Sequence, residues 1–389
     1  MQVSAPAHQS HPGILAARNG AVPLATPRQI QAIREPLQRL QAIASPDRSV
    51  VSDEWKSKGT AFEYGSAANP DLSPIPIDAF TGRAHESGTE SGVVPLDLSE
   101  YLETEYPATA PNLLANFVKI VSGKRLETYA NATSQAFYVL RGRGSTKTEW
   151  GSISWAKGDV FVLPAASRPV THHADSDDKD GAAFYWVHDE PLLNYLGVKP
   201  NETRFEPTLF RAQDMTDEVM RLRNEPGSED RNRCGILLAT ESTAKSTKTL
   251  SHVLWALYNL LPAKSFQKPH KHSALALDLA VYAPQGTYTL MGPELNSKGE
   301  IIDPVRVDWA TGGMFTTPPG WWHSHHNDSD EDAWVFPIQD AALYTYQRTL
   351  NIRFGPEEAQ HIQEHRQVGA TFKGKNIRVH HANGTPPPL

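Results

Sequence analysis

The same pattern of residues occurs twice along this chain, and this repetition restricts the fold more than any other feature. Residues 155–164 read WAKGDVFVLP and align with residues 309–318, WATGGMFTTP. Further on, DEPL at 189–192 aligns with DAAL at 340–343, in the same order. Each match lies within a series of short apolar runs separated by glycine and proline, which is typical of antiparallel strands. The chain is therefore predicted to contain one β unit twice.

The duplication divides the chain into five predicted segments. They are an N-terminal arm with a helix and loops (1–111), a first β unit (112–200), a linker with some helix (201–250), a second β unit (251–355) and a C-terminal tail (356–389). Within the arm, residues 26–43 carry isoleucine and leucine at spacings of three and four, which predicts one amphipathic helix. Pro36 should kink or split that helix.

Composition and charge narrow the range of functions. The 389 residues include 37 Lys and Arg against 44 Asp and Glu, a formal net charge of −7. This balance disfavours a nucleic-acid partner, which normally meets a basic face. The single cysteine, Cys234, excludes an internal disulfide and a cysteine-based zinc site. No apolar run reaches the roughly 18 residues of a spanning helix, and no signal peptide is visible, so we expect a cytoplasmic protein without a membrane partner.

The residues that carry chemistry lie in the second unit. His270 and His272 are two residues apart, and in a strand such side chains point to the same face. Further along, a turn rich in glycine and proline is predicted to return the chain to the sheet with His323 facing inward. Imidazoles gathered in this way predict a metal site. The segment that contains His323 has the spacing G-x5-P-x-G-x2-H-x3-N, with its fixed positions at Gly312, Pro318, Gly320, His323 and Asn327.

These two segments resemble the two motifs of the cupin superfamily. The second motif is matched at every fixed position, and the first, G(x)5HxH(x)3–4E(x)6G, is matched at its histidines. Lys264 stands at its first glycine, and Ala276 and Leu277 stand at its glutamate positions. The resemblance implies an all-β bicupin with two double-stranded β-helix (jelly-roll) barrels behind an N-terminal helical arm. The predicted metal ligands are His270, His272 and His323, with no carboxylate in the usual place.

The first unit can be framed on the same motifs, but its ligand positions are occupied by other residues. Tyr129 and Asn131 replace the two histidines, and Gln135 replaces the glutamate. In the second motif a proline stands at the histidine position, and His172 and His173 come three or four residues too late. We therefore predict that the second barrel holds a metal and that the first does not.

Three neutral imidazoles would leave a divalent ion its full charge and several open positions. This arrangement suits Fe(II), which can hold a bidentate substrate together with O2. Manganese, nickel and copper accept the same ligands, whereas zinc usually sits in a closed tetrahedral site. Fe(II) is the predicted cofactor, with Mn, Ni, Cu and Zn as alternatives.

A duplicated cupin with a three-histidine site is similar to the gentisate and salicylate 1,2-dioxygenase group. The resemblance covers residues 112–200 and 250–350. It implies cleavage of a hydroxylated aromatic ring with Fe(II) and O2, and homo-oligomers formed by exchange of N-terminal segments. Six residues after the second histidine, those enzymes carry an arginine that helps to hold the substrate carboxylate, whereas this chain has Asp278. An anion there should repel a carboxylate, which disfavours gentisate itself.

The sequence leaves the roles of several residues near this site open. Asp278 could orient a substrate hydroxyl or amine, act as a base or join the metal shell, or it could pair with a lysine or arginine in the barrel. Trp322 could form a wall for an aromatic substrate or pack the barrel mouth as core. His325 and His326 are interpreted as loop residues, although one of them could lie near the metal. The other candidate substrate-binding residues, chosen by their places on predicted strands, are Gln267, Tyr288, Arg306, Gln339 and Arg353.

Three functions are compatible with these residues. The leading hypothesis is an Fe(II)-dependent dioxygenase, an oxidoreductase whose partners are O2 and a small hydroxylated aromatic substrate. A second is a non-oxidative metal-dependent cupin enzyme, such as a lyase or isomerase, in which Asp278 or a tyrosine moves the proton. A third is a bicupin that binds a small molecule without turnover. The fold alone does not decide between them, because this barrel carries many activities.

Overall fold

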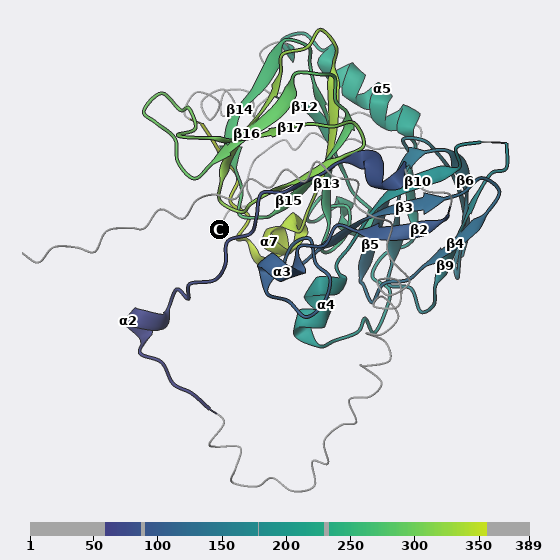
Figure 1. The fold of residues 1–389 in the computed structure, drawn as a ribbon, viewed down its shortest axis with the longest axis horizontal. Helices are drawn as coiled ribbons and strands as arrows, with labels where there is room; N and C mark the ends of the chain where they lie inside the picture. The colour runs from purple at the N-terminus through teal and green to yellow at the C-terminus, as the bar shows by residue number, and fades with distance from the viewer. Residues whose placement is uncertain (1–58, 87–89, 178, 229–232, 356–389) are drawn as a thin grey trace, which may run out of the picture.

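Two β barrels lie side by side in the computed structural model (Figure 1). The structure describes residues 59–86, 90–177, 179–228 and 233–355. The predicted helix at 26–43 and the predicted C-terminal tail at 356–389 lie outside the described residues. Among the helices of the described ranges, none combines the length and the apolar character needed to cross a membrane.

The first barrel consists of two antiparallel sheets. Its six-stranded sheet runs in the order β11 (Thr208–Phe210), β8 (Val160–Pro164), β5 (Ser134–Arg141), β10 (Ala182–His188), β3 (Leu114–Ile120) and β2 (Gly92–Pro95). Its four-stranded sheet runs in the order β4 (Arg125–Thr128), β9 (Val170–Ala174), β6 (Arg143–Thr148) and β7 (Gly151–Ala156).

The second barrel repeats this plan. Its six-stranded sheet runs in the order β1 (Ala79–Phe80), β18 (Met314–Thr317), β15 (Ala276–Tyr282), β20 (Ala333–Gln339), β13 (Trp255–Leu261) and β12 (Cys234–Leu238). Its five-stranded sheet runs in the order β17 (Val305–Asp308), β16 (Thr287–Gly292), β19 (Trp322–Asn327), β14 (Ser265–Lys271) and β21 (Arg353–Phe354). The order β8-β5-β10-β3 thus matches β18-β15-β20-β13, and the predicted all-β, duplicated architecture is confirmed.

Short helices connect the strands, and two of them explain why the sequence at 189–192 is repeated at 340–343. The helices are α2 (Tyr64–Ala67), the 3-10 turn η2 (Gly82–His85), α3 (Ser99–Leu102), α4 (Glu190–Leu196), α5 (Ala212–Arg223), α6 (Glu241–Ala244) and α7 (Ala341–Gln347). Asp189 and Asp340 stand directly before α4 and α7. Each buried carboxylate accepts a backbone N–H from a neighbouring segment, Ser134 in the first barrel and Leu275 in the second. The repeated aspartates therefore tie each helix to its barrel.

The hydrophobic core has three parts. The largest cluster joins the barrels and includes Tyr185 of β10 and Leu277 and Phe336 of the second barrel. A second cluster fills the first barrel with stacked aromatic rings such as Phe137, Phe161 and Trp186. A third, smaller cluster fills only part of the second barrel. Strands that bury both faces in this way read as nearly continuous apolar runs.

Strand pairing extends both barrels beyond the predicted segments. The predicted N-terminal arm supplies β2 to the first barrel and β1 to the second. The predicted linker supplies β11 to the first barrel and β12 to the second, with α5 between them. These strands are only two to five residues long, so their sequences are too short to show a periodicity of their own.

Candidate metal centre

Two neighbouring strands, β14 and β19, bring the predicted ligands together. Gln267 pairs with His325 and His270 pairs with His323, with a register shift between Gln267 and His270. The shift is a β-bulge, which inserts one extra residue and re-aims the side chains that follow it. Pro269 lies in the bulge, where its missing N–H costs no ladder bond. Because of the bulge, Gln267 and His270 point to the same side of the strand although they are three residues apart.

The three predicted ligands form one compact group. His270, His272 and His323 each offer one ring nitrogen, and these atoms lie within 4.8 Å of one another. The ring centroids of His270 and His323 are 3.9 Å apart, and those of His272 and His323 are 4.8 Å apart. Nitrogens bound to a common ion at about 2.1 Å lie at most about 4 Å from each other, so a small inward movement would complete the shell.

Backbone carbonyls determine which nitrogen two of the three rings offer. Nδ1 of His272 lies 2.7 Å from the carbonyl of Ala274, and Nδ1 of His323 lies 3.1 Å from the carbonyl of Trp321. A carbonyl only accepts, so both Nδ1 atoms carry the proton and both Nε2 atoms present lone pairs. Among the residues that the structure describes, Nδ1 of His270 is buried without a hydrogen-bond partner. Burial also lowers the pKa of all three imidazoles, to about 4 for His272, which keeps them neutral. This donor set fits a divalent metal ion.

The glycine and asparagine positions of the second motif have a structural basis in the turn and at the end of β19. Gly312 and Gly320 adopt φ of 74° and 76°, values that favour glycine. The N–H of Gly320 donates to the carbonyl of His272 over 2.8 Å, which ties the turn to the ligand strand. The side-chain amide of Asn327 donates to three backbone carbonyls, among them those of Leu261 and Glu331. Asn327 thus holds the end of β19 in place and is not a ligand.

His325 is buried beside the ligands, whereas the sequence favoured a loop position for it. The hydroxyl of Thr289 lies 2.8 Å from Nε1 of Trp309 and 2.8 Å from Nδ1 of His325. Because an indole N–H only donates, the hydroxyl accepts from Trp309, and the same hydroxyl is hydrogen-bonded to Nδ1 of His325. Its ring centroid is 5.8 Å from that of His323.

The sequence duplication could have predicted that His325 lies on a strand inside the barrel. In the first barrel, Nε1 of Trp155 lies 2.9 Å from the hydroxyl of Thr146, which lies 2.8 Å from Nδ1 of His172. Trp155 and Trp309 are aligned by the repeated pattern in the sequence. The histidines attached to them are therefore equivalent, and both belong to strands.

Asp278 faces the interior of the second barrel from β15, opposite the histidine strands. It is 3% exposed, and its Oδ2 accepts a hydrogen bond of 2.6 Å from the hydroxyl of Thr317. Burial raises the pKa of Asp278 to about 7, and the bond from Thr317 opposes this only in part. Within the part of the chain that the structure describes, no lysine or arginine pairs with this carboxyl. The interpretation as half of an internal ion pair is thereby corrected.

Two of the predicted substrate-binding residues lie on the interior side, close to the histidines. Gln267 is 2% exposed, and its buried Nε2 has no hydrogen-bond partner within the described ranges of the chain. Nε2 of Gln339, on β20, lies 3.4 Å from Nε2 of His272. The two amides therefore add hydrogen-bonding groups around the candidate metal position.

The other predicted substrate-binding residues lie on the outer face of the sheet. Tyr288 stacks on His326 and carries the Arg306 guanidinium over its ring at 3.6 Å. Trp322 alternates with His323 along β19 and lies beneath the ammonium of Lys271. The structure does not bring Tyr288, Arg306 and Trp322 to the three candidate ligands, because side chains alternate between the two faces of a strand and these three point outward. Arg353, on β21, is exposed.

Sequence reasoning missed a stack of groups next to His270. Phe354 pairs with His270 across β14 and β21, and their ring centroids are 6.3 Å apart. The Arg233 guanidinium lies over the ring of Phe354, 5.1 Å from its centroid. Its charge is the second cause, after burial, of the lowered pKa of His270. Arg233 adjoins β12, a strand that was not predicted.

Comparisons with known proteins identify the fold. No protein-family model matches the sequence, and no curated protein sequence matches it. A solved structure of a salicylate 1,2-dioxygenase variant from Pseudoaminobacter salicylatoxidans, in complex with gentisate, matches with a TM-score of 0.56 and 12% identity, covering 90% of this chain and 99% of that one. Another structure of that dioxygenase, from Pseudaminobacter salicylatoxidans, matches with a TM-score of 0.55 and 12% identity over 85% and 99%. At this identity the likeness shows the fold alone, and the chain has the predicted bicupin fold.

Proposed function

We propose that this protein is an Fe(II)-dependent dioxygenase that acts on a small hydroxylated aromatic molecule in its C-terminal barrel. The observation that carries the proposal is the group of three neutral imidazoles, His270, His272 and His323, with two tautomers fixed by backbone carbonyls. Bound Fe(II) would supply electron transfer to O2 and open positions for a chelating substrate. The similarity in fold to a salicylate 1,2-dioxygenase supports this choice.

The interior groups favour an uncharged substrate over a carboxylated one. Asp278, Gln267 and Gln339 provide a carboxyl and two amides on the interior side. The guanidinium of Arg233, whose charge reaches the histidines, lies over the ring of Phe354. The amides could orient a hydroxyl or an amine, whereas nothing in this set would neutralise a carboxylate. We therefore favour catechols and aminophenols over gentisate.

Asp278 is proposed to take a proton from the substrate. A phenol hydroxyl loses its proton more readily once the molecule chelates a metal, and a nearby base must accept that proton. Asp278 has a pKa near 7, so at neutral pH a substantial share is ionised and able to accept. The Thr317 hydroxyl holds Oδ2, which leaves Oδ1 for the transfer.

The test is oxygen uptake by the purified protein loaded anaerobically with Fe(II). Catechol, 2-aminophenol and gentisate are supplied in turn, and the expected order places gentisate last. His323→Ala is the control that should abolish uptake, while Thr128→Ala in the first barrel should leave it unchanged. No oxygen uptake with any of these compounds by the iron-loaded protein would contradict the proposal.

A second candidate is a non-oxidative metal-dependent lyase or isomerase. The raised pKa of Asp278 favours it, because a group that titrates near neutrality can both accept and return a proton. The two candidates differ in their need for O2. Turnover of a substrate under strict anaerobiosis, abolished by Asp278→Asn, would favour the non-oxidative enzyme.

A further inference from the structure

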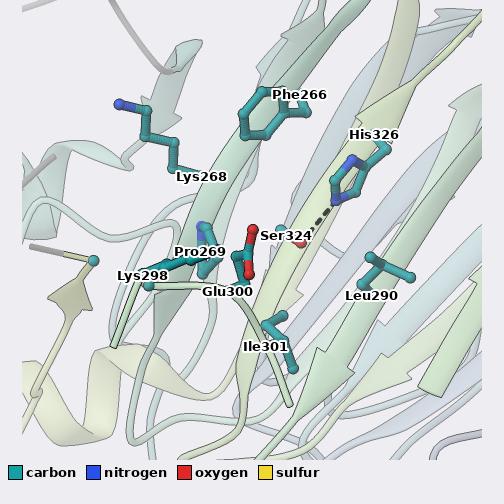
Figure 2. A pocket seen from close by; sticks show the side chains of 11 residues that line it. Phe266, Lys268, Pro269, Leu290, Lys298, Glu300, Ile301, Ser324 and His326 are labelled. Carbon is teal, nitrogen blue, oxygen red and sulfur yellow. Dashed lines mark hydrogen bonds between the residues drawn. The ribbon is translucent and has the colours of Figure 1, made fainter. Parts of the chain in front are cut away.

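The two barrels carry cavities at different places. In the second barrel, a cavity of about 430 Å³ lies between the sheet of β14, β16 and β19 and the segment that follows β16 (Figure 2). In the first barrel, a cavity of about 320 Å³ lies at one end of the barrel and is lined by residues 129–132, 149–150, 165–167 and 199–203. We call it the mouth cavity. It lies where β4, β8 and β10 end, and the matching end of the second barrel carries the three candidate metal ligands.

The wall of the mouth cavity has no net charge. Its two carboxylates belong to Glu149 and Glu202, and its ammonium group belongs to Lys199. The guanidinium of Arg204 pairs with Glu202 over 2.8 Å. The carboxylate of Glu149 accepts two hydrogen bonds of 2.7 Å from Ser167, one from its N–H and one from its hydroxyl. Because these charges balance, the wall favours a neutral ligand over an ion.

Glu190, the first residue of α4, connects this wall to the barrel interior. Its Oε1 accepts the N–H of Asn131, a lining residue, over 3.2 Å, and its Oε2 lies 4.0 Å from Nδ1 of His188. Burial and then the charge of Glu190 raise the pKa of Tyr129, a second lining residue. The side chain of Glu190 is 19% exposed, whereas that of His188 is 2% exposed. A molecule that enters the mouth cavity therefore reaches Glu190 before His188.

The hydrogen bonds of Asn116 fix the proton of His188 on Nδ1. One side-chain atom of Asn116 lies 3.3 Å from the carbonyl of Trp186 and 3.2 Å from Nε2 of His188. Because the carbonyl only accepts, this atom is the amide nitrogen, which only donates. Burial lowers the pKa of His188 to about 3, so the ring is neutral and its Nε2 accepts. Nδ1 is then the protonated nitrogen, and among the described residues it has no hydrogen-bond partner.

Two more buried polar atoms lie on the same face of the sheet. Gln135 pairs with His188 across β5 and β10, and Trp186 precedes His188 by two residues, so the three side chains share the interior face. Within the described ranges, Oε1 of Gln135 and Nε1 of Trp186 also have no partner. Buried polar groups are normally hydrogen-bonded, so this face requires a ligand or ordered water.

The duplication places these groups where the second barrel has its candidate metal centre. In the alignment of 189–192 with 340–343, His188 corresponds to Gln339 and Glu190 corresponds to Ala341. Nε2 of Gln339 lies 3.4 Å from Nε2 of His272. The first barrel therefore has an imidazole and a carboxyl at the place where the second barrel has an amide and a methyl group.

We propose that the mouth cavity is a second ligand site, for a small neutral molecule with several hydroxyl groups, such as a cyclitol or a monosaccharide. A hydroxyl placed between His188 and Glu190 accepts from Nδ1 and donates to Oε2. A metal ion cannot accept this N–H, and a carboxylate would meet Glu190 with a like charge. The volume lies within the range of roughly 300–1,000 Å³ found for small-molecule sites, and the rings of Tyr129 and Trp150 offer apolar surface to the C–H groups of the ligand.

The probe is myo-inositol, and the measurement is isothermal titration calorimetry on the full chain. Cyclohexanol has the same carbon ring with one hydroxyl and serves as the matched ligand. We expect one saturable site for inositol with a Kd of about 0.1–10 mM, and binding at least about fivefold weaker for cyclohexanol. Inositol 1-phosphate should also bind at least about fivefold more weakly, because its charge meets the carboxylates of Glu190 and Glu149.

Four variants locate the binding. Glu190→Ala installs the residue that the second barrel has at the aligned position, so α4 should still form, and it should weaken inositol binding by about fivefold or more. Trp150→Ala, in the wall, should weaken it by about threefold or more. Glu127→Ala, at an exposed position of β4, is the control that should bind normally. His272→Ala should also bind inositol normally, which separates this site from the proposed iron chemistry.

Thermal unfolding checks that each variant folds. No saturable binding of inositol would leave ordered water as the occupant and would overturn the proposal. Equal affinity for inositol and cyclohexanol, or unchanged binding by both Glu190→Ala and Trp150→Ala, would overturn it as well. A second equivalent of bound metal that Glu190→Ala removes would show that the first barrel holds an ion instead.

Discussion

Thr128 occupies in the first barrel the position that His270 occupies in the second. Thr128 pairs with Val170, and His270 pairs with His323. Val170 stands two residues before His172, and His323 stands two residues before His325. Each of these later histidines is hydrogen-bonded to a threonine that also bonds a tryptophan. The sequence frame had placed Tyr129 at this position. That alignment of the two barrels was wrong by one residue, because β14 contains a bulge that β4 lacks.

This equivalence gives a matched test of the metal ligands. Replacing His270 with alanine removes one of three donors, whereas Thr128→Ala makes a comparable change at the same place in the other barrel. We expect His270→Ala to lower metal content by at least about tenfold and Thr128→Ala to leave it unchanged. Elemental analysis after dialysis measures the content, and thermal unfolding checks that both variants fold. Equal metal content in the two variants would show that the ion is held elsewhere.

Metal binding should persist in mildly acidic solution. A proton competes with a metal only when the pH approaches the pKa of the ligand, and burial lowers the pKa of His272 to about 4. Between about pH 7.5 and pH 5.5 we expect affinity to change less than about threefold, whereas an ordinary histidine would lose about tenfold at the lower pH. Competition with a chelator at several pH values measures this.

The same shift has a consequence for the metal-free protein. The pKa of His272 in the folded state lies below that in the unfolded state, so the unfolded chain binds more protons at acidic pH. Above about pH 6.5 the ring is neutral in both states and the shift costs nothing, and the cost grows as the pH falls from about 6.5 toward 4. Urea unfolding of the metal-free protein across this window should show stability falling on acidification. Stability that rises as the pH falls would contradict the assigned shift.

The sequence predicted that His270, His272 and His323 come together but not what surrounds them, and the reason is physical. His270, His272 and His323 lie in short local motifs whose glycines and proline are readable from spacing alone. The faces of Tyr288 and Arg306 depend on strand register, and one residue of slip turns a side chain to the other face. The position of Arg233 beside Phe354 depends on the pairing of short edge strands, which carry no periodic signal.

Asp278→Asn should stabilise the protein at alkaline pH. Burial raises the pKa of this carboxyl from 3.8 to about 7, so the folded state binds more protons than the unfolded state between these values. The unmodified protein therefore loses stability as the pH rises through this window, and the asparagine variant does not. We expect a gain of roughly 1–3 kcal/mol at about pH 8 that disappears near pH 4. Urea unfolding measures it, and Asp71→Asn, at an exposed position, is the control. A variant that is less stable than the parent at pH 8 would refute the buried charge.

Thr289→Val and Thr146→Val form a second matched pair. Each removes a buried hydroxyl that joins an indole to an imidazole, so the indole N–H and the imidazole Nδ1 lose this partner, while Nε2 of His172 keeps its bond to the Thr128 hydroxyl. An unsatisfied buried group costs about 1–3 kcal/mol, so both variants should lose about 2 kcal/mol or more in urea unfolding. Only Thr289→Val frees the ring beside His323, so only this variant should change metal affinity in chelator competition. The prediction fails when both variants affect metal affinity alike.

Lys264→Gly should stabilise the protein although it removes a side chain. Lys264 has φ of 53°, in the left-handed region, and stands at the motif position where the first barrel has Gly123, with φ of 67°. A non-glycine residue there costs about 1 kcal/mol or more. The ammonium of Lys264 bonds the carbonyl of Asp328 and pairs with Asp330, but it is exposed, so these contacts offset little. After allowing for the greater freedom of glycine in the unfolded chain, we expect a gain of about 0.5 kcal/mol in urea unfolding, with metal content unchanged.

Gly123→Ala is the reciprocal change and should act in the opposite direction. A Cβ at position 123 would lie 3.2 Å from Cβ of Ser176, and the residue would keep a positive φ. Strain and crowding together should lower the free energy of unfolding by about 1 kcal/mol or more. If Lys264→Gly destabilised the protein as much as Gly123→Ala does, the lysine contacts would outweigh the strain of the turn. The two turns would then be equivalent in sequence position but not in energetics.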